Sequence, residues 1–460
     1  MPKYVAVIDL GKTNSKVALV NTKLAQEVLV TTQANIVNSA SEYPCLDHQA
    51  IKAFVLDSLK MLANEHEFEA ITVTTHGATV ALLDKDGDLA LPVLDYEYEG
   101  VDALRAEYER YRAPFASTGS PALPGGLNVG AQLHWLEKNY PEKFASVTSI
   151  LTWPQYWIYI LSGEQNNDVT SLGCHTDLYD PDRADYSSLV DAMQWRHLLA
   201  PACKPGQLSG TLLKSLTDQL GLPRSIPVFS GIHDSNASLV PHLLTNTAPF
   251  SVVSTGTWFI SMAIGGKETQ LDESRDTLIN VNALGQSVPS ARFMGGRERE
   301  LLKVTGKANE KALQQLLDDA NPEPAMVMPS AVRGTGPYPT SQLQWIGRAI
   351  DNPELRNCAV TLYLALMTHE CLLLIGSRGA TYVEGPLAHD SLYGQMLCAV
   401  SNRQVLISDA QTGTSVGAAM LITPPETLPE YQQVTIDQTR RNQLRLYAER
   451  WKKQLQIHAK

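Results

Sequence analysis

The chain has 460 residues, of which 44% are hydrophobic and 18% charged, a composition typical of a soluble globular protein long enough for two domains. Its formal net charge of -11 disfavours nucleic acid and anionic membranes as partners, because the field of the protein would repel both. No apolar run reaches the roughly 18 residues of a membrane helix, and the six cysteines form no CxxC pair, which argues against a disulfide framework or a zinc site.

The N-terminal residues read directly as a strand over 4–9, with no charged-then-apolar signal segment before it. Together with the scattered cysteines, this predicts a cytoplasmic protein whose thiols are reduced and mostly buried.

The first half of the chain alternates strand and helix patterns. Apolar, β-branched residues at 4–9 and 15–20 flank the breaker Gly11-Lys12-Thr13-Asn14, which predicts a hairpin. A strand over 70–75 ends at His76-Gly77, and the turn at 84–87 indicates a second hairpin. Apolar residues at helical spacing predict helices over 47–64, 101–112, 130–139 and 153–161. Residues 164–210 are rich in loops.

The second half repeats the strand signals and then becomes helical. Strands are expected over 226–230, 250–254 and 258–263. Helices are expected over 308–317, 353–376, 391–401 and 437–460.

Two turns, 11–14 and 256–257, have the residues that a phosphate-binding loop needs. Small residues let backbone N–H groups approach an anion, and threonine hydroxyls add donors. Asp9, at the end of a buried strand, suits Mg²⁺ or its water shell, and Lys16 would add a cation. Two ordinary hairpins with glycine at the turn remain the alternative.

The segment from Phe229 to Leu239 carries the candidate catalytic residue. A strand ends at Gly231, Asp234 follows in the turn, and a helix of small residues begins. A carboxylate at such a strand end is well placed to act as a base on a substrate hydroxyl. The alternative is an aspartate that only caps the helix.

Two glycine-containing segments near the C-terminus, 384–387 and 412–419, could hold an adenosine, or could be a structural turn and a packed helix. Other kinase and nucleotide folds lack their signatures here. The sequence has no GxxxxGK[ST] loop, no HRD or DFG set, and no GxGxxG after a strand.

Taken together, these motifs resemble the FGGY carbohydrate kinases of the hexokinase–actin–heat-shock-chaperone superfamily, in the correct order along nearly the whole chain. Residues 9–16 are similar to the first phosphate motif, Gly231-Ile232-His233-Asp234 to the Gly-x-x-Asp catalytic element, and 254–257 to the second phosphate motif. Departures include Glu384-Gly385, where the family often has two glycines. The resemblance is nearest to the rhamnulokinase and fuculokinase side.

The resemblance implies an α/β fold of two ribonuclease-H-like (actin-like ATPase) domains with a cleft between them. Residues 1–245 would form the sugar-binding domain with the first phosphate motif, and 246–460 the nucleotide-binding domain. ATP and Mg²⁺ would be the cofactors, with Asp9 holding the metal directly or through water. A small-molecule sugar would be the partner, and a homodimer is left open.

Site residues follow from the resemblance and from the polar character that a sugar site requires. Asp234 would be the catalytic base. Nucleotide and phosphate binding would fall to Gly11, Lys12, Thr13, Asn14, Lys16, Gly256, Thr257, Gly385, Gly413 and Thr414. The sugar would meet His76, Gly77, Asp95, Glu97, Gln155, Tyr156, Asp168, His175 and Asp234, with Trp153 and Trp157 as apolar neighbours.

The expected enzyme is a phosphotransferase that moves the γ-phosphate of ATP to a hydroxyl of a ketose, in particular an L-6-deoxyketohexose such as L-rhamnulose or L-fuculose. The alternatives are a pentulose or polyol kinase, with a substrate like xylulose, ribulose or glycerol, and a non-catalytic sugar- or nucleotide-binding protein on the same fold.

Overall fold

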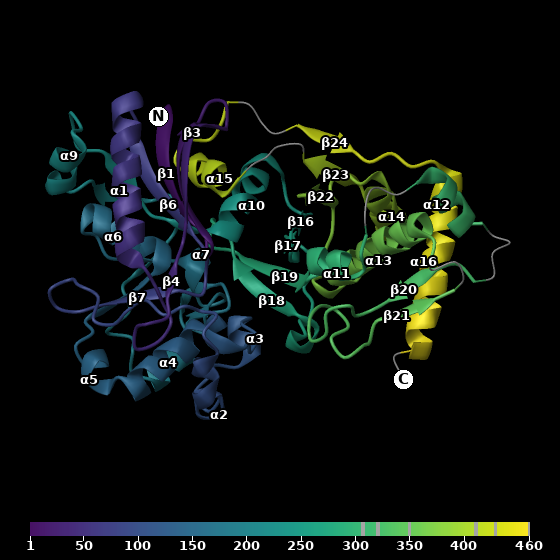
Figure 1. Ribbon diagram of the computed structural model, residues 1–460, viewed down its shortest axis with the longest axis horizontal. Coiled ribbons are helices and arrows are strands. Elements are labelled where there is room, and N and C mark those ends of the chain that lie inside the picture. The colour runs from purple at the N-terminus through teal and green to yellow at the C-terminus, as the bar shows by residue number, and fades with distance from the viewer. Residues whose placement is uncertain (305–308, 319–322, 348–350, 409–412, 427–429, 459–460) are drawn as a thin grey trace. The chain divides into compact units, whose positions relative to one another are not determined.

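The computed structural model describes residues 1–304, 309–318, 323–347, 351–408, 413–426 and 430–458. The chain divides into two compact units, each with its own large sheet (Figure 1). Unit 1 comprises Met1–Thr245, Ile279–Ser287 and Thr412–Leu428, and unit 2 comprises Asn246–Leu278, Val288–Gln411 and Pro429–Lys460. Residues 413–426, which were expected in the second domain, therefore pack within unit 1.

Unit 1 has the following elements. Its strands are β1 (Tyr4–Leu10), β2 (Asn14–Asn21), β3 (Gln26–Ala34), β4 (Val37–Asn38), β5 (Cys45–Leu46), β6 (Ala70–Thr75), β7 (Val80–Leu83), β8 (Ser149–Thr152), β9 (Asn167–Asp168), β10 (Tyr179–Asp180), β11 (Asp185–Tyr186), β12 (Ala202–Cys203), β13 (Leu208–Thr211), β14 (Pro227–Phe229) and β15 (Ile232–His233). Its α-helices are α1 (His48–Glu65), α2 (Arg105–Tyr108), α3 (Phe115–Thr118), α4 (Val129–Asn139), α5 (Pro141–Phe144), α6 (Trp153–Ser162), α7 (Val169–Leu172), α8 (Ser188–Ala192), α9 (Lys214–Leu220), α10 (Asp234–Thr245) and α15 (Thr414–Met420). The 3₁₀-helices η1 (Glu99–Leu104) and η2 (Gly125–Leu127) complete it.

The large sheet of unit 1 has the order β13-β14-β6-β1-β2-β3, with β15 also paired to β6. Strands β1, β2 and β3 are antiparallel neighbours, whereas β1, β6 and β14 run parallel. Parallel strands end at the same edge of a sheet, so the residues after β1, β6 and β15 lie close together. This edge carries the candidate site.

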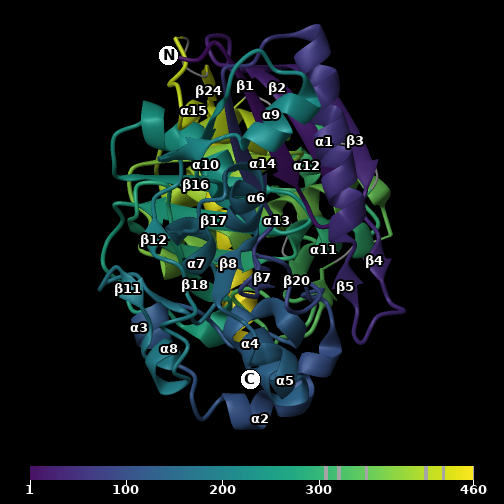
Figure 2. The same cartoon turned by 90° about the vertical axis from the view of Figure 1, so that its left-hand side faces the viewer.

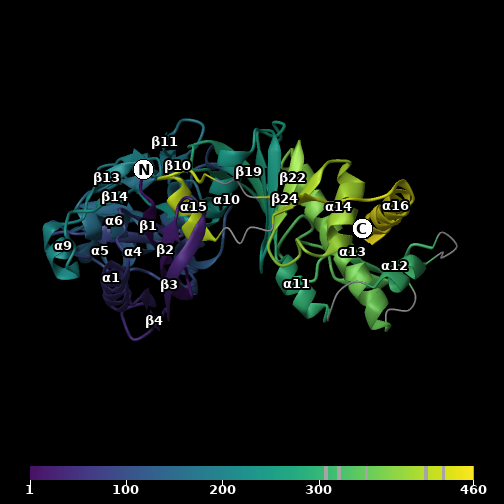
Figure 3. The same ribbon diagram turned by 90° about the horizontal axis from the view of Figure 1, so that it is seen from above.

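Both faces of the sheet are covered at its centre, which explains why the central strands β1 and β6 are almost entirely buried. Ala6, Ile8 and Leu10 pack with α1, α6 and α9 on one face. Val5 and Val7 pack on the other face with α10 and α15. The views in Figures 1 and 3 both place α15, from the C-terminal part of the chain, beside β1 and α10. Figure 2 shows α1 across the face that it covers.

Unit 2 contains strands and helices from the second half of the chain. Its strands are β16 (Phe250–Thr255), β17 (Phe259–Ile264), β18 (Thr277–Val281), β19 (Ser287–Phe293), β20 (Met326–Met328), β21 (Gln344–Ile346), β22 (Ala380–Glu384), β23 (Val405–Ser408) and β24 (Tyr431–Gln433). Its helices are η3 (Glu273–Arg275), α11 (Gly295–Leu301), α12 (Glu310–Leu316), α13 (Pro353–Leu374), α14 (Ser391–Ser401) and α16 (Gln438–His458). The tip of the β18–β19 hairpin, 279–287, belongs to unit 1.

The sheet of unit 2 has the order β18-β19-β17-β16-β22-β23-β24, and α13, α14 and α16 pack with it around one core. Among the described helices, α13 alone is long and apolar enough to cross a membrane, but 83% of its most apolar window is buried within the protein. It is the central core helix of this unit, because residues on all its sides belong to the buried cluster.

Several predicted elements differ from those in the structure. Residues 101–112 form only η1 and the four-residue α2 rather than one long helix. The turn at 84–87 is present, with Gly87 N donating to Asp84 O at 3.1 Å, and Leu83 pairs across it with Leu89 in an isolated antiparallel bridge. In addition, β7 pairs along its length with the distant β8. Residue 308 and residues 459–460, at the ends of two predicted helices, lie outside the described residues, as does Thr412.

Candidate functional site

The turn between β1 and β2 is held by a residue that the sequence analysis did not identify. Asn35 donates from Nδ2 to Gly11 O at 2.8 Å and accepts from Ser15 Oγ at 2.6 Å. Its backbone N–H also donates to Thr13 O at 2.8 Å. Thr13 and the neighbouring Asn14 are exposed, so the turn presents polar groups on a fixed backbone. This geometry fits a phosphate-binding turn.

Asp9, at the end of β1, lies at the centre of a polar cluster. Its Oδ2 accepts from Thr414 Oγ1 and, at 3.1 Å each, from Ser415 Oγ and Lys16 Nζ. Lys16 Nζ also contacts Glu27 Oε1 at 2.9 Å. Burial lowers the pKa of Lys16, but Asp9 and Glu27 outweigh it, so the pKa is raised and the ammonium stays charged.

The same cluster can accommodate a magnesium ion only with help from other ligands. No group of three or more His, Cys, Asp or Glu residues suited to a metal occurs among the described parts of the chain. Mg²⁺ is usually bound through one or two carboxylates with phosphates and water. No described residue donates to Oδ1 of Asp9, so this atom is available to the ion or its water, and the donor set fits a metal that arrives with a nucleotide.

Lys12 has different partners from those expected. Its Nζ forms an ion pair with Asp95 and lies 3.4 Å from Glu97 Oε2. It also stands 4.9 Å from the centroid of the Tyr96 ring, a cation–π distance. The side chains of Lys12 and Asp95 are only 14% and 7% exposed. Lys12, predicted at the phosphates, thus joins the residues predicted for the sugar, because two carboxylates hold its ammonium there.

His76 lies next to this group. Its ring centroid is 5.4 Å from that of Tyr96, and its Nδ1–H donates to Gly77 O at 2.9 Å. Burial lowers the pKa of His76, so the imidazole is neutral with Nε2 free to accept a hydrogen bond. Gly77 makes room for a second ring, since a Cβ there would lie 2.9 Å from His233 Nε2.

Asp234 follows β15 and opens α10. His233 Nε2 lies 3.2 Å from its Oδ1, and Ser235 N donates to the same oxygen at 2.6 Å. An N-cap aspartate would accept from the amide two or three residues further on, and no described contact of Asp234 is of that kind. Its side chain is 30% exposed. Asp234 is therefore a partly exposed carboxylate beside a buried imidazole, which suits a general base better than a cap.

Two residues expected to contact the sugar lie in the interior. Gln155 is fully buried, and its Oε1 accepts from Gly231 N at 2.7 Å, beneath the segment that carries Asp234. Tyr156 stacks on Trp153 and belongs to the core cluster of the first sheet, as does Trp157. Trp153 and Trp157, expected as apolar neighbours of the sugar, are likewise core residues, each 1% exposed.

Asp168 is also fully buried. Its two carboxylate oxygens accept from Thr152 Oγ1 at 2.8 Å, Thr170 Oγ1 at 2.5 Å and Ser171 N at 2.8 Å. Burial raises its pKa against these three donors. Its role is to cap α7 and hold Thr170, which in turn accepts from His233 N at 3.0 Å.

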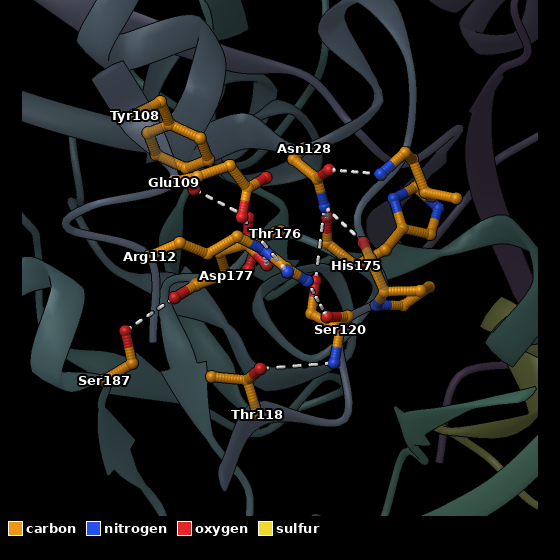
Figure 4. Close-up of polar contacts among 12 residues, drawn as sticks. Tyr108, Glu109, Arg112, Thr118, Ser120, Asn128, His175, Thr176, Asp177 and Ser187 are labelled. Atoms are coloured by element: carbon orange, nitrogen blue, oxygen red, sulfur yellow. Dashed lines mark hydrogen bonds and ion pairs between the residues drawn. The ribbon is translucent and has the colours of Figure 1, made fainter. Parts of the chain in front are cut away.

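His175 is held by the polar network in Figure 4. Its Nδ1 bonds Leu127 O at 2.7 Å, and its own carbonyl accepts from Asn128 Nδ2 at 2.9 Å. Two residues further, Asp177 pairs with Arg112 Nε at 3.3 Å and accepts from Tyr108 OH at 2.6 Å. These anchors fix His175 in a left-handed conformation, with φ of 43°. His175 is half-buried, and Nε2 is the ring nitrogen that does not take part in the bond to Leu127 O.

In unit 2, the predicted phosphate turn follows β16. Gly256 and Thr257 are exposed, and Gly296 N donates to Thr257 O at 3.1 Å. Thr255 Oγ1 bridges to the next strand, donating to Glu384 O at 2.7 Å. Gly385 then adopts φ of 86°, where a Cβ would lie 2.9 Å from Thr255 O. The structure thus brings Gly256, Thr257 and Gly385 together at the carboxyl ends of two parallel strands.

Gly413 and Thr414 belong to unit 1, whereas Gly385 belongs to unit 2. Gly413 is the N-cap of α15, and a Cβ on it would be 4.0 Å from Lys16 Nζ. Thr414 bonds Asp9 directly. Two predicted nucleotide residues therefore face the first phosphate motif within their own unit.

Each unit is a mixed α/β layer structure, and the two-sheet fold is that of the actin-like ATPases, as the sequence predicted. A model of the N-terminal domain of the FGGY family of carbohydrate kinases matches residues 4–241, and a model of the family's C-terminal domain matches residues 247–430. The chain belongs to the FGGY family of carbohydrate kinases.

Two relatives that are named for their activity share about a quarter of their residues with this chain. L-fuculokinase of Salmonella typhi is 26% identical over 340 residues, 70% of each chain. Rhamnulokinase of Yersinia pestis bv. Antiqua (strain Angola) is 26% identical over 338 residues, which are 69% of this chain and 66% of the relative.

Solved structures support the fold. A carbohydrate kinase from Novosphingobium aromaticivorans is 36% identical, with 99% of each chain covered and a TM-score of 0.91. Plasmodium falciparum glycerol kinase with ADP, at 14% identity, superposes with a TM-score of 0.78 over 99% of this chain and 98% of that one. FGGY kinases use ATP, and the expectation of an enzyme of this class is confirmed.

Proposed function

We propose that this kinase transfers the γ-phosphate of ATP to a hydroxyl of a ketose, with Asp234 as the general base. One observation carries the proposal: Lys12, His76 and Asp234 follow the carboxyl ends of β1, β6 and β15, and Lys12 pairs with Asp95 and lies over the Tyr96 ring that also contacts His76. A sugar offers many hydroxyls, and such a group can bind several of them at once.

The chemistry assigns a role to each part of the site. Asp234 takes the proton of the attacking hydroxyl. Asp95, Glu97 and the Nε2 of His76 accept hydrogen bonds from other hydroxyls, and Lys12 holds Asp95 in place. When bound, ATP supplies the phosphoryl group and Mg²⁺ neutralises its charge. The exposed turns offer backbone donors to the phosphates, and Asp9 holds the metal or its water.

For the sugar we propose an L-6-deoxyketohexose. The support is the likeness to an L-fuculokinase and a rhamnulokinase. The polar residues predict strong selection for hydroxyl stereochemistry, since an unpaired buried polar group can cost about 10⁴-fold, whereas a methyl group discriminates only about 10–200-fold.

A substrate panel tests this choice. L-rhamnulose, L-fuculose, D-xylulose, D-ribulose and glycerol are compared by kcat/KM, with ADP release as the measurement. We expect one deoxyketose to exceed the pentuloses and glycerol by about tenfold or more. If kcat/KM for a pentulose or for glycerol is higher by that factor, the proposed sugar is wrong but the kinase assignment is unaffected. Activity on none of the five compounds would favour a different acceptor.

Gly256→Ala tests the second phosphate turn. A Cβ at this position would lie 3.5 Å from Trp258 O, an ordinary contact, so the fold should tolerate the change. If phosphate oxygens approach the Gly256 backbone, the methyl group should weaken ATP binding by about tenfold or more. The KM for the sugar serves as the internal control, and unchanged ATP affinity in a folded variant would show that the turn is structural only.

A further inference from the structure

The donors around Asp234 are distributed unequally between its two oxygens. Ser235 N, Ser235 Oγ and His233 Nε2 lie 2.6, 3.3 and 3.2 Å from Oδ1. Among the described residues, none forms a hydrogen bond or ion pair with Oδ2. A carboxylate held at one oxygen by two hydrogen bonds and an ion-pair contact can rotate little, and its second oxygen keeps its lone pairs for another proton.

We propose that His233 is a positioning residue for catalysis, which fixes the Asp234 carboxylate through Oδ1 so that Oδ2 receives the proton of the substrate hydroxyl. This inference rests on the proposed function, in which Asp234 is the base. In the transfer, the O–H bond of the sugar breaks and its proton goes to Oδ2. The sugar oxygen bonds to the γ-phosphorus, whose bond to the β–γ bridging oxygen breaks to leave ADP.

His233 is itself rigidly held. Its side chain is 7% exposed, and its backbone N–H donates to Thr170 Oγ1 at 3.0 Å. Gly77 passes so close that any side chain there would strike Nε2. On the other side of the ring, Nδ1 lies 3.3 Å from the amide of Asn236. A side chain fixed on three sides can hold its neighbour to a few tenths of an ångström.

The Asn236 amide indicates which protons the ring carries. The Nδ2 atom of Asn236 faces the ring, and its buried Oδ1 has no partner among the described residues. The two amide orientations are assigned from the hydrogen bonds that they satisfy. With the amide turned over, Oδ1 accepts from Nδ1–H of His233, and Nδ2 takes the place at which the oxygen had no partner. Both ring nitrogens are then donors, and His233 is an imidazolium.

The surrounding charges favour the same state. Burial lowers the pKa of His233, but Cys174 and Asp234 oppose it, with a smaller contribution from Asp168, and raise the pKa to about 9. Burial raises the pKa of the Cys174 thiol, but His175 and His233 lower it by more, so the net pKa lies well below the usual value of a thiol. The neutral His76 also faces this group. The imidazolium is therefore present below about pH 9, and it is lost as the pH rises through that value.

Substitution of His233 separates its polar contact with Asp234 from its charge. His233→Ala removes both, and we expect kcat to fall by about 10–100-fold with little change in the KM for ATP, because a displaced base costs rate rather than nucleotide binding. His233→Gln keeps an N–H donor for Oδ1, so it should recover much of kcat. Its kcat/KM should lose the decline near pH 9, and the acidic limb should move to higher pH because the cation beside Asp234 is gone.

Two further variants make the test decisive. His197→Gln changes an exposed histidine of the same unit and should leave kcat and its pH profile unchanged. Cys174→Ala removes the thiol that raises the pKa of His233, so the alkaline decline should move below pH 9. Thermal melting and ADP binding establish that each variant is folded. If His233→Ala does not fold, His233→Gln and Cys174→Ala still test whether His233 positions Asp234.

The outcomes distinguish this inference from the proposed function. If the Asp234→Asn variant is fully active, Asp234 is not the base, and the positioning role of His233 is rejected as well. An inactive Asp234→Asn variant, with wild-type kcat and pH profile in the His233 variants, overturns only the role of His233. Wild-type profiles in both His233→Gln and Cys174→Ala likewise reject the imidazolium.

Discussion

Asp234→Asn should lower kcat by about 10²–10⁴-fold, the usual contribution of a positioned general base. The amide has the size of the carboxylate but cannot accept the proton, so sugar and nucleotide should still bind. The surroundings favour folding of the variant, because the side chain is 30% exposed and the amide oxygen can still accept from Ser235 N. Steady-state ADP release and direct binding of both substrates measure the two effects.

The matched control for this experiment is Asp218→Asn. Asp218 is an exposed aspartate of α9 in the same unit, paired with Lys214 at 3.1 Å. Exposed ion pairs contribute between 0 and about 1 kcal/mol, so activity and stability should stay close to those of the wild type. A folded Asp234→Asn protein with near-normal kcat would remove Asp234 from the chemistry and leave the family membership untouched.

Gly417→Ala should destabilise the protein by about 3 kcal/mol, which is severe for a single methyl group. Helices α10 and α15 pack so closely that a Cβ at Gly417 would lie 1.9 Å from Ala237 O. The obstacle is backbone, which cannot rotate aside as a flexible side chain can. A change of this size corresponds to a fall in Tm of roughly 6–12 °C for a domain of this size.

Gly413→Ala, four residues earlier, is the matched control. A Cβ there would meet only Glu27 Oε1 at 3.8 Å and Lys16 Nζ at 4.0 Å, and the backbone φ of -64° suits any residue. Its Tm should change by no more than about 2–3 °C. Calorimetry of the two variants beside the wild type makes the comparison, and equal Tm values for all three would mean that α10 and α15 do not pack this tightly in solution.

The sequence predicted local structure well where one signal determines it. The breaker at 11–14 between two β-branched runs gives the β1–β2 hairpin, and the glycine at 231 before Asp234 gives the strand end and the start of α10. Such features depend on backbone preferences of a few neighbouring residues. They were sufficient to recognise the family, because four local motifs occur in its order.

Side-chain partners that are distant in sequence could not be predicted. Nothing near Lys12 indicates an ion pair with Asp95, and nothing near Thr414 indicates a bond to Asp9. These pairs exist because sheet register and helix packing bring them together, which spacing along the chain does not encode. His233 had a local signal, since it directly precedes the proposed base on the same strand end, but the sequence analysis did not use it.

The assignment of α15 to unit 1 has a consequence for how the protein forms during synthesis. Val5 and Val7 lie on a sheet face that α15 helps to cover, yet this helix begins at Thr414. At translation rates of about 5–20 residues per second, ribosomes need on the order of ten seconds or more to translate from Thr245 to Thr414. The nascent N-terminal half must keep that face from aggregating during this interval, so a chaperone requirement should be strongest before the last segment emerges.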